Sequence, residues 1–303
     1  MKKKYVIIDA DTGIDDAMAI SYASYLKNID ILLAIGSTGN TLSKNSAVNN
    51  INILQSIGRE NIKVACGREE ALGNKTIVLN VHGLTGLGEF KFDKPKKEPI
   101  VGDIADTIHQ TIKDVCEKIT YICLGPATNF SYFIKKYPND LNKFSAIYFS
   151  GGLIEELSED ETPYLGFNAA FDPYAMEVLL SQDIPVYIVP SNLGHEAYLT
   201  WKDVSTIKHL NKTGAMFEEI FRFYHDRHVK NGIATHDLCG LMAFTDEKLF
   251  EFVNADVKVV YRKDLPSGVL SFNFMNGGRY YVATGVNVKA VKRRFIKTIK
   301  RMP

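Results

Sequence analysis

Four aspartates lie within eight positions near the start of the chain, directly behind an apolar run. The stretch reads YVIIDADTGIDDAMAI over residues 5–20, and its carboxylates are Asp9, Asp11, Asp15 and Asp16. Carboxylates this close repel one another, and a hard divalent cation with oxygen ligands commonly relieves the repulsion. A solvated acidic turn is the ordinary alternative for a run of charge. The apolar residues before the aspartates indicate a strand buried on both faces, which favours the functional interpretation.

The pattern of the chain changes after Gly13, where apolar residues begin to recur at helical spacing. Asp15 and Asp16 would then lie in the first turn of a helix, where the helix dipole favours negative charge. Asp9 and Asp11 would lie at the strand-to-helix turn, which is where open α/β sheets place their ligands. The sequence therefore predicts a cation site at the end of the first strand.

Apolar runs alternate with amphipathic stretches along most of the chain, and no linker divides it. This alternation predicts βαβ units and one α/β domain over residues 1–303, with a Rossmann-like, open, mainly parallel sheet flanked by helices. The predicted strands are residues 5–8, 31–35, 62–65, 120–124, 145–149, 186–189, 257–261 and 280–283. The predicted helices are residues 15–27, 43–57, 103–117, 128–137, 173–181, 215–229 and 287–300.

Polar residues follow several of the predicted strands. Because parallel strands end at the same edge of a sheet, these residues are expected to converge there with the aspartates. Carboxylate, amide and hydroxyl oxygens suit Ca²⁺ or Mg²⁺ and a polyhydroxylated ligand better than Zn²⁺. The residues concerned are Asn40, Thr128, Asn129, Asn168, Asn192 and His195.

Two histidines also lie in motifs that could carry chemistry. His236 stands beside Asp237 in THDLCG, before an apolar helix-like run. A satisfied structural histidine and a general acid with a metal-binding neighbour are both consistent with that position. His82 lies in the Gly-rich stretch NVHGLTGLGEF, whose spacing is not that of a phosphate loop. We interpret it as an imidazole on a mobile loop.

The composition excludes several classes of protein. The 303 residues carry 36 basic and 35 acidic side chains, and a net charge of +1 argues against a dedicated nucleic-acid or membrane-surface protein. No run approaches the ~20 apolar residues of a membrane span. The lysines at 2–4 precede only a few apolar residues, so no signal peptide is expected. The cysteines lack metal-ligand spacing. We expect a cytoplasmic protein without nucleic-acid or membrane partners.

A haloacid dehalogenase-type phosphatase remains an alternative at this point. The run IIDADTG has an apolar strand and a D-x-D-x-T-like spacing, in which Asp9 would be the nucleophile and Asp11 the acid/base. The GIDD that follows is not part of that pattern.

The stretch DADTGIDD resembles the opening motif D-x-D-P-G-x-D-D of the Ca²⁺-dependent nucleoside hydrolases of the inosine–uridine-preferring type, with Thr12 in place of the proline. Further motifs follow in the order of that family, and the likeness extends from residue 5 to about residue 245. They are TGN at Asn40, HGLTGLG at His82, GPATN at Thr128, GFNAAFDPYA at Asn168 and Asp172, and HDLCG at Asp237.

The resemblance implies an α/β fold and Ca²⁺-dependent hydrolysis of the N-glycosidic bond of ribonucleosides to base and ribose. It implies that Asp11, Asp16, Asp237 and the Thr128 main-chain carbonyl hold Ca²⁺, and that Asp11 also takes a proton from the attacking water. Asp15, Asn40 and Asn168 would hold ribose hydroxyls, His82 would contact the substrate, and His236 would protonate the base. Members of the family are often dimers or tetramers, so a homo-oligomer is expected.

The implied chemistry is physically coherent. Breaking an N-glycosidic bond develops oxocarbenium character on the sugar, which fixed negative charge beneath the ring stabilises. A water activated by a cation beside a carboxylate is a suitable nucleophile. The usual pair of glycosidase carboxylates is a different solution.

The chain departs from the family where the ribose 5′-hydroxyl is expected. Relatives have a Glu before the Phe-Asn and an Asn several residues earlier, whereas this chain has Gly166 and Asp160. Asp160 is the candidate to reach the hydroxyl instead. Otherwise the space at Gly166 would favour a 5′-modified nucleoside, and this is the outcome we expect. A Ca²⁺- and nucleoside-binding protein with little turnover is the third hypothesis.

Overall fold

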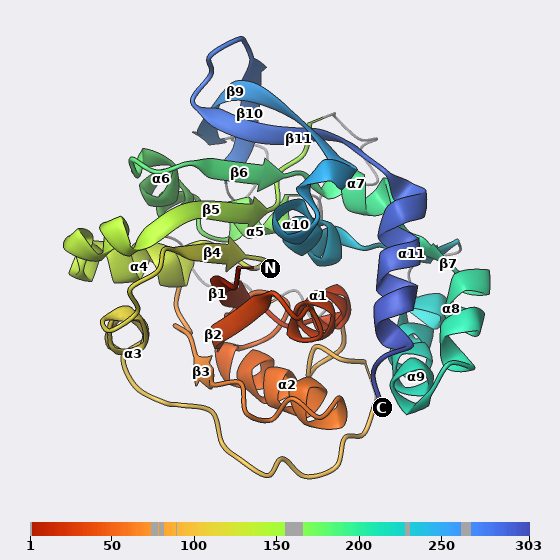
Figure 1. Ribbon diagram of the computed structural model, residues 1–303. Coiled ribbons are helices and arrows are strands. Elements are labelled where there is room, and N and C mark those ends of the chain that lie inside the picture. The colour runs from red at the N-terminus through yellow and green to blue at the C-terminus, as the bar shows by residue number, and fades with distance from the viewer. Residues whose placement is uncertain are drawn as a thin grey trace.

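A computed structural model describes residues 2–73, 78, 82–88, 90–154, 166–227, 231–261 and 268–303. Helices cover both faces of one large twisted sheet (Figure 1). In the described part of the chain the sheet has nine strands in the order β10-β9-β11-β6-β5-β4-β1-β2-β3. The strands are β1 (Lys4–Ala10), β2 (Ile29–Gly36), β3 (Val64–Cys66), β4 (Ile119–Cys123), β5 (Phe144–Ser150), β6 (Val186–Val189), β9 (Phe250–Tyr261), β10 (Gly268–Phe274) and β11 (Tyr280–Val286).

The first six strands are parallel to their neighbours in the sheet, and β11 joins them parallel to β6. At one end of the sheet, β9 pairs in the antiparallel sense with both β10 and β11. Two short strands, β7 (Leu199–Thr200) and β8 (Gly232–Ile233), form a separate antiparallel pair. The expected α/β fold with a mainly parallel sheet is confirmed.

Side chains alternate between the two faces of the sheet, as strand geometry requires. Val6 and Ile8 pack into one buried cluster, and Ile7 between them packs into the other. The first cluster contains residues of α1 (Ile14–Ser24), α2 (Ser43–Ser56), α7 (Ser191–Glu196), α8 (Trp201–Lys208), α9 (Lys212–Arg227), α10 (His236–Thr245) and α11 (Val288–Ile299). The second contains residues of α3 (Ile104–Ile112), α4 (Thr128–Lys136), α5 (Phe167–Phe171) and α6 (Pro173–Ser181).

All eight predicted strands and all seven predicted helices are present. Helix α6 has the predicted bounds, whereas α3 ends at Ile112, five residues before the predicted end. Strands β7, β8 and β10 and helices α5, α7 and α8 were not predicted. Strand β10 is an edge strand that pairs only with β9, the strand directly before it in the chain.

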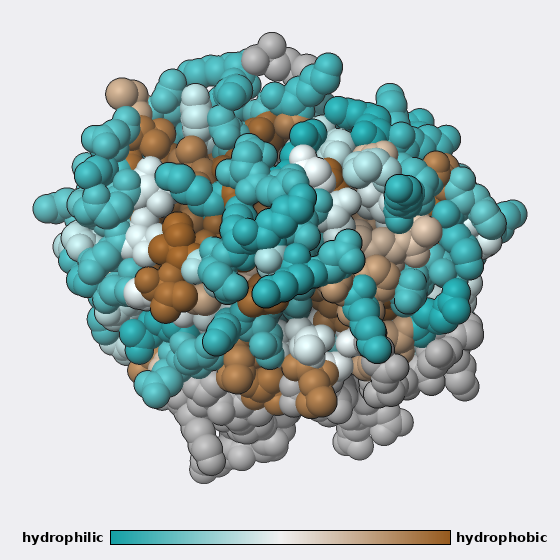
Figure 2. All heavy atoms as spheres, turned by 90° about the horizontal axis from the view of Figure 1, so that it is seen from below, coloured by the Kyte–Doolittle hydropathy of each residue, from teal (hydrophilic) through white to brown (hydrophobic). Residues whose placement is uncertain are grey.

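The lower face of the view in Figure 1, around α2 and the segment before α3, is mainly hydrophilic with scattered apolar groups (Figure 2). This agrees with lysine runs that lie in solvent. Among the described residues, no helix is both long and apolar enough to cross a membrane.

Candidate active site

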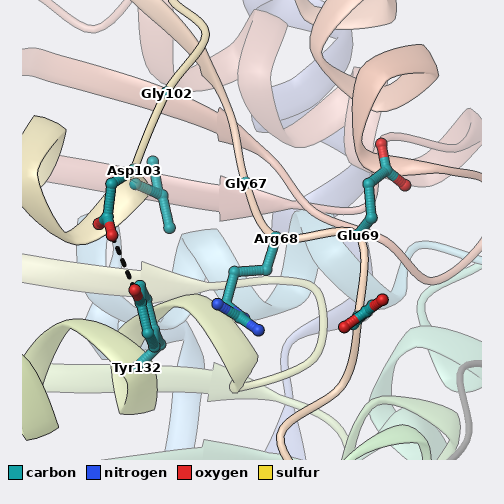
Figure 3. Close-up of a pocket in the computed structure, with 8 residues that line it drawn as sticks. Gly67, Arg68, Glu69, Gly102, Asp103 and Tyr132 are labelled. Atoms are coloured by element: carbon teal, nitrogen blue, oxygen red, sulfur yellow. Dashed lines mark hydrogen bonds between the residues drawn. The ribbon is translucent and has the colours of Figure 1, made fainter.

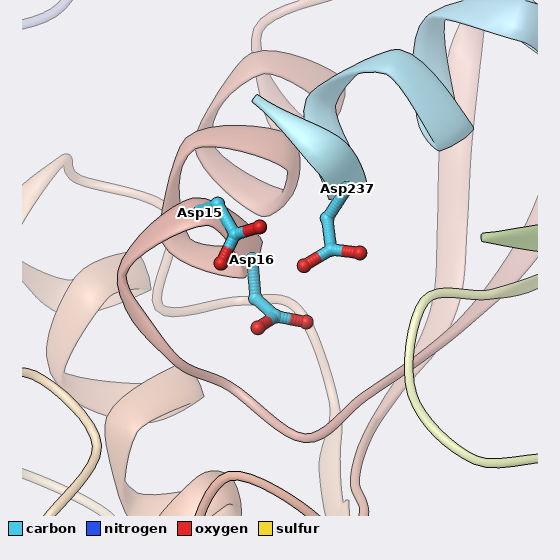
Figure 4. A group of neighbouring side chains, drawn as sticks. All are labelled: Asp15, Asp16 and Asp237. Carbon is cyan, nitrogen blue, oxygen red and sulfur yellow. The ribbon is translucent and has the colours of Figure 1, made fainter. Parts of the chain in front are cut away.

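Three carboxylates meet where α1 and α10 begin. Asp15 and Asp16 come from the first turn of α1, Asp237 comes from the first turn of α10, and all three are buried. Figure 4 shows the three carboxyl groups turned toward one another from the two helices. One oxygen from each lies within 4.8 Å of the other two. Asp237 follows Asp15 and Asp16 by more than 200 residues in the chain, and the packing of α10 beside α1 brings the three together.

Asp16 has one satisfied and one unsatisfied oxygen. Its Oδ2 accepts a hydrogen bond from the Gly13 amide at 2.8 Å and a longer one from Asn40 Nδ2 at 3.5 Å. Its Oδ1 is buried and has no hydrogen-bond partner among the described residues. A buried carboxylate oxygen without a donor requires an explanation, and a bound ion is one.

The Asp11 carboxylate lies beside the other carboxylates and packs between two glycines. Its Oδ2 accepts from the Asn40 amide at 2.7 Å. A Cβ atom at Gly39 would lie 2.2 Å from this oxygen, and one at Gly125 would lie 3.1 Å from Asp11 Oδ1. These two glycines therefore provide the space that the carboxylate occupies.

The electrostatics of the group favour a cation. Burial, and secondarily the charge of Asp15, raises the pKa of Asp11 to about 7. Burial and the neighbouring carboxylates also raise the pKa of Asp16 and of Asp237 well above 3.8, although Ser150 Oγ donates to Asp237 Oδ1 at 3.0 Å. A divalent cation would reverse these shifts because it favours the charged form of every carboxylate around it. The oxygen-only donor set and the unpartnered Asp16 Oδ1 fit a hard cation such as Ca²⁺.

Asp9, in the same motif, is a structural residue. Its carboxylate is fully buried and accepts hydrogen bonds from Ser37 Oγ, from Tyr121 Oη at 2.7 Å and from Asn129 Nδ2 at 3.0 Å. Burial still raises its pKa to about 6 despite these donors. A phosphatase nucleophile must be accessible to its substrate, so this arrangement argues against the phosphatase alternative.

Thr128 lies in the loop-to-helix segment after β4, and its side chain is buried. It opens α4, and its hydroxyl donates to Asp172 Oδ2 at 2.9 Å. This hydrogen bond uses the side chain of Thr128, so the role that the resemblance gives to its main-chain carbonyl stays a prediction.

Asn168 is held by the ends of two strands. Its Nδ2 donates to the Leu124 carbonyl and, at 2.9 Å, to the Ser150 carbonyl. These bonds fix the orientation of the amide and leave Oδ1 as an acceptor for a ligand hydroxyl. Asn40 lies on the opposite side, where its amide group contacts Asp16.

His236 is the first residue of α10 and is partly buried. Its Nδ1 contacts the Ser191 carbonyl at 2.9 Å. Because a carbonyl only accepts, Nδ1 carries a proton and Nε2 is the atom that can exchange one. Gly194 permits this arrangement, since a Cβ atom there would lie 2.4 Å from His236 Nδ1.

His82 is buried against the start of α1. Its Nδ1 accepts from the Ile14 amide at 2.8 Å, and its Nε2 lies 2.7 Å from Tyr224 Oη. An Nδ1 that accepts carries no proton, so the neutral ring donates through Nε2 to the tyrosine oxygen. In this arrangement His82 shapes the wall of the site and ties the segment 82–88 to α1.

Gly166 caps α5 with a left-handed backbone, at φ 82°. Asp160, the other predicted 5′ residue, lies outside the described residues. Asn192 accepts from the Ile154 amide through Oδ1 at 3.1 Å, and so joins α7 to the loop after β5.

A separate pocket of about 260 Å³ lies beyond β3 (Figure 3). Arg68 stacks there over the ring of Tyr132 at 4.3 Å, and the tyrosine hydroxyl donates to Asp103 at 2.7 Å. None of the predicted site residues lines this pocket.

Several contributing residues were not predicted from the sequence. Each gains its role from a partner far along the chain, Leu124 through its main-chain carbonyl and the others through polar or aromatic side chains. Ser150 was detectable in part, because it follows a buried strand directly. The residues are Ser37, Tyr121, Leu124, Ser150 and Tyr224.

Comparisons with known proteins agree with this geometry. Residues 6–293 match the family model described as inosine-uridine preferring nucleoside hydrolase. The chain is 28% identical to a pyrimidine-specific ribonucleoside hydrolase RihA of Photobacterium profundum, and the match covers 84% of each protein. It is 26% identical to a non-specific ribonucleoside hydrolase RihC of Klebsiella pneumoniae, over 81% of this chain and 80% of that one.

Solved structures show the same fold. A plant nucleoside hydrolase, PpNRh1, superposes with a TM-score of 0.86 at 26% identity, over 98% of this chain and 99% of that one. A purine-preferring ribonucleoside hydrolase from Gardnerella vaginalis gives a TM-score of 0.88 at 23% identity, over 98% of each chain. The family match extends over nearly the whole chain, from the aspartate motif to α11. The chain therefore belongs to the inosine-uridine preferring nucleoside hydrolase family and is an N-glycosyl hydrolase that releases the base and ribose of ribonucleosides.

Proposed function

We propose that this enzyme depends on Ca²⁺, held by Asp11, Asp16, Asp237 and the Thr128 main-chain carbonyl. One observation carries the proposal: Asp16 Oδ1 is buried without a donor, among carboxylates from two helices. Ca²⁺ accepts 6–8 oxygen ligands in flexible geometry, whereas Mg²⁺ demands near-ideal octahedral geometry and retains waters. When bound, the cation would balance the carboxylates and lower the pKa of a water in its shell.

Asp11 is the proposed general base. Its carboxylate is fixed by the Asn40 amide, so it can receive a proton from the attacking water without first reorienting. Burial raises the pKa of Asp11 to about 7 in the cation-free protein, and a bound cation would bring that pKa down again.

The sugar is proposed to lie between α1 and α5. Asn168 Oδ1 faces it as an acceptor, while Asp15 and Asn40 hold further hydroxyls from the opposite side. The carboxylates beneath the ring stabilise the positive charge that develops as the glycosidic bond breaks. His82 lines the same wall beside Gly13, since a Cβ atom at Gly13 would lie 2.1 Å from its Nδ1.

His236 is the proposed acid for the departing base. Its Nδ1 is occupied by the Ser191 carbonyl, so Nε2 would deliver the proton. No preference for a particular base is proposed. Relatives are named pyrimidine-specific, non-specific and purine-preferring, so they do not agree on one preference.

The test combines a binding and a turnover measurement. Protein freed of cations is titrated with Ca²⁺ by calorimetry, and base release is followed over purine and pyrimidine ribonucleosides. One bound Ca²⁺ per chain and cation-dependent release are expected. Turnover without any Ca²⁺ binding would refute the calcium proposal, and Ca²⁺ binding without turnover would favour a binding protein. Phosphate release from phosphomonoesters would revive the phosphatase alternative.

A cytoplasmic location and a homo-oligomeric state are proposed as well. The four free cysteines support the first, because thiols stay reduced in the cytosol. Membership of the family supports the second, which light scattering on the purified enzyme would test.

A further inference from the structure

Thr12 stands where the opening motif of the family has a proline. A proline ring would hold its own φ at about −65° and would also restrict the backbone of the preceding residue. That preceding residue is Asp11, one of the carboxylates proposed to hold the cation. Threonine imposes neither restraint, so this chain needs another way to fix the turn between β1 and α1.

The Thr12 side chain provides one restraint by reaching α2. Thr12 is completely buried, and its Oγ1 donates a hydrogen bond to Asn50 Oδ1 at 2.7 Å. Asn50 lies 38 residues further along the chain, in α2, and is also completely buried. Helix α2 packs beside α1 (Figure 1). Because both partners are shielded from water, losing one leaves the other unsatisfied.

The Thr12 main chain is held by the neighbouring residue of the same helix. Asn49 Nδ2 donates to the Thr12 carbonyl at 2.9 Å and to the Thr85 carbonyl at 2.6 Å. An amide group carries two hydrogens, so it can serve both acceptors at once. Gly86 comes so close that a Cβ atom there would lie 2.9 Å from the Thr12 carbonyl oxygen. Helix α2 therefore holds Thr12 by its side chain and by its main chain.

The turn that α2 fixes carries proposed cation ligands on both sides of Thr12. Asp11 comes directly before it. Gly13 comes directly after it, and the Gly13 amide donates to Asp16 Oδ2 at 2.8 Å. The carboxylates of the site repel one another when no cation is bound. A fixed turn keeps them together before the cation arrives, and a site that is already arranged binds more tightly than one that must first be assembled.

We propose that Thr12 is a positioning residue of the cation site, and that its hydrogen bond to Asn50 replaces the restraint that proline gives in the family motif. The inference rests on the proposed function, because the cation concerned is the proposed Ca²⁺. A hydrogen bond that only stabilised the fold would affect unfolding and leave Ca²⁺ affinity unchanged. Ca²⁺ affinity therefore separates a positioning role from ordinary stabilisation.

The test measures Ca²⁺ affinity by calorimetry on the full chain after removal of bound cations. Thr12→Val, which has nearly the same shape without the hydroxyl, should weaken Ca²⁺ binding about tenfold, the low end of what a lost partner of a metal ligand costs. Thr12→Ser keeps the hydroxyl and should stay within about threefold of wild type.

Ser131→Ala is the matched control. Ser131 is equally buried, and its Oγ donates to the Ala175 carbonyl at 2.6 Å, which joins α4 to α6. Its loss should lower the melting temperature, as the loss of any buried hydrogen bond does, and should leave Ca²⁺ affinity unchanged.

A rescue experiment tests the comparison with proline and covers the case in which Thr12→Val does not fold. Asn50→Ala should weaken Ca²⁺ binding as much as Thr12→Val, since it removes the other partner of the same bond. Adding Thr12→Pro to Asn50→Ala should restore the affinity to within about threefold of wild type. The Thr12 amide donates to no main-chain carbonyl among the described residues, so the proline ring removes no such bond.

Unchanged Ca²⁺ affinity in Thr12→Val or in Asn50→Ala, whichever folds, overturns the proposal. So does a double variant, Thr12→Pro with Asn50→Ala, that binds Ca²⁺ no more tightly than Asn50→Ala. A wild type that releases base but binds no Ca²⁺ refutes the calcium proposal itself, and that result is distinct because it needs no variant.

Discussion

Buried carboxylates of this enzyme form two groups with opposite surroundings. Asp9 and Asp172 are completely buried and surrounded by donors. Asp172 accepts from the Leu72, Gly73 and Ala175 amides and from Thr128 Oγ1, at 2.6, 3.3, 3.1 and 2.9 Å. Asp16 and Asp237 are also buried, but their neighbours are other carboxylates, and one Asp16 oxygen has no donor.

The difference shows why four aspartates can follow one strand. Burial alone does not distinguish a structural carboxylate from a functional one. A carboxylate that protein donors satisfy joins chain segments together, as Asp9 joins β1 to β4 and α4. A carboxylate left without donors creates a local excess of negative charge, and the site then favours a cation. Opposite responses to mutation are therefore expected from the two groups.

Asp16→Asn should give the largest effect. Removing one carboxylate from the proposed cation site should lower kcat/KM on the order of 10³-fold, because electrostatic help from a metal is worth several kcal/mol. The same change should raise the melting temperature of the cation-free protein, since it removes like-charge repulsion. Calorimetry with Ca²⁺ and thermal unfolding check both outcomes. If the cation-free variant melted at a lower temperature than the cation-free wild type, the distinction between the two groups of carboxylates would be wrong.

His236→Ala tests whether His236, which belongs to neither group of carboxylates, delivers the proton to the departing base. General acid catalysis is typically worth ~10²–10⁴-fold. A loss of about 10²-fold on natural nucleosides is expected, with little loss on nitrophenyl riboside, whose leaving group needs no proton. Parallel steady-state assays on the two substrate types measure it. Equal losses on both would assign His236 to binding or structure.

Asp9→Ala should reduce stability whether or not Ca²⁺ is present. The change leaves the donors on Ser37, Tyr121 and Asn129 buried without their acceptor. Each unsatisfied group costs ~1–3 kcal/mol, so a loss of about 3 kcal/mol in the free energy of unfolding is expected. Urea denaturation with and without Ca²⁺ provides the measurement. Unchanged stability would mean that Asp9 is not the structural residue described above.

The pH dependence of stability should distinguish the two states of the site. Burial raises the pKa of Asp11 from 3.8 to about 7, so the cation-free folded protein binds more protons than the unfolded chain between these values. Its stability should therefore fall as pH rises from 4 to 7, by up to ~1.4 kcal/mol per pH unit for one such group. Bound Ca²⁺ should flatten this dependence. Urea denaturation across that range tests it, and a rise in stability with pH for cation-free protein would contradict it.

Thr128→Val should give the smallest effect. It removes one hydrogen bond to Asp172 and leaves the Thr128 carbonyl in place, so a loss of ~1 kcal/mol in stability is expected. Ca²⁺ affinity should remain within about threefold of wild type, with Thr128→Ser as the control that keeps the hydroxyl. A Ca²⁺ affinity lower by ~10–100-fold, the usual cost of losing support for a metal ligand, would show that the bond to Asp172 orients the Thr128 carbonyl on the cation.

The sequence by itself determined the α/β fold and pointed to the aspartates of the proposed cation site. Apolar periodicity is a local property, so the parallel strands and the helices between them could be predicted. The crowding of Asp9, Asp11, Asp15 and Asp16 was also visible, because those residues are neighbours in the chain.

Only the tertiary structure decided which of those aspartates lack donors. The donors to Asp9 come from residues 28 to 120 positions away, and Asp237 reaches the cluster through the packing of α10 on α1. The placement of Thr128 and the bond between Thr12 and Asn50 were decided in the same way. The physical reason is that hydrogen bonding and packing join residues by position in space, and spacing along the chain does not encode which distant partner arrives.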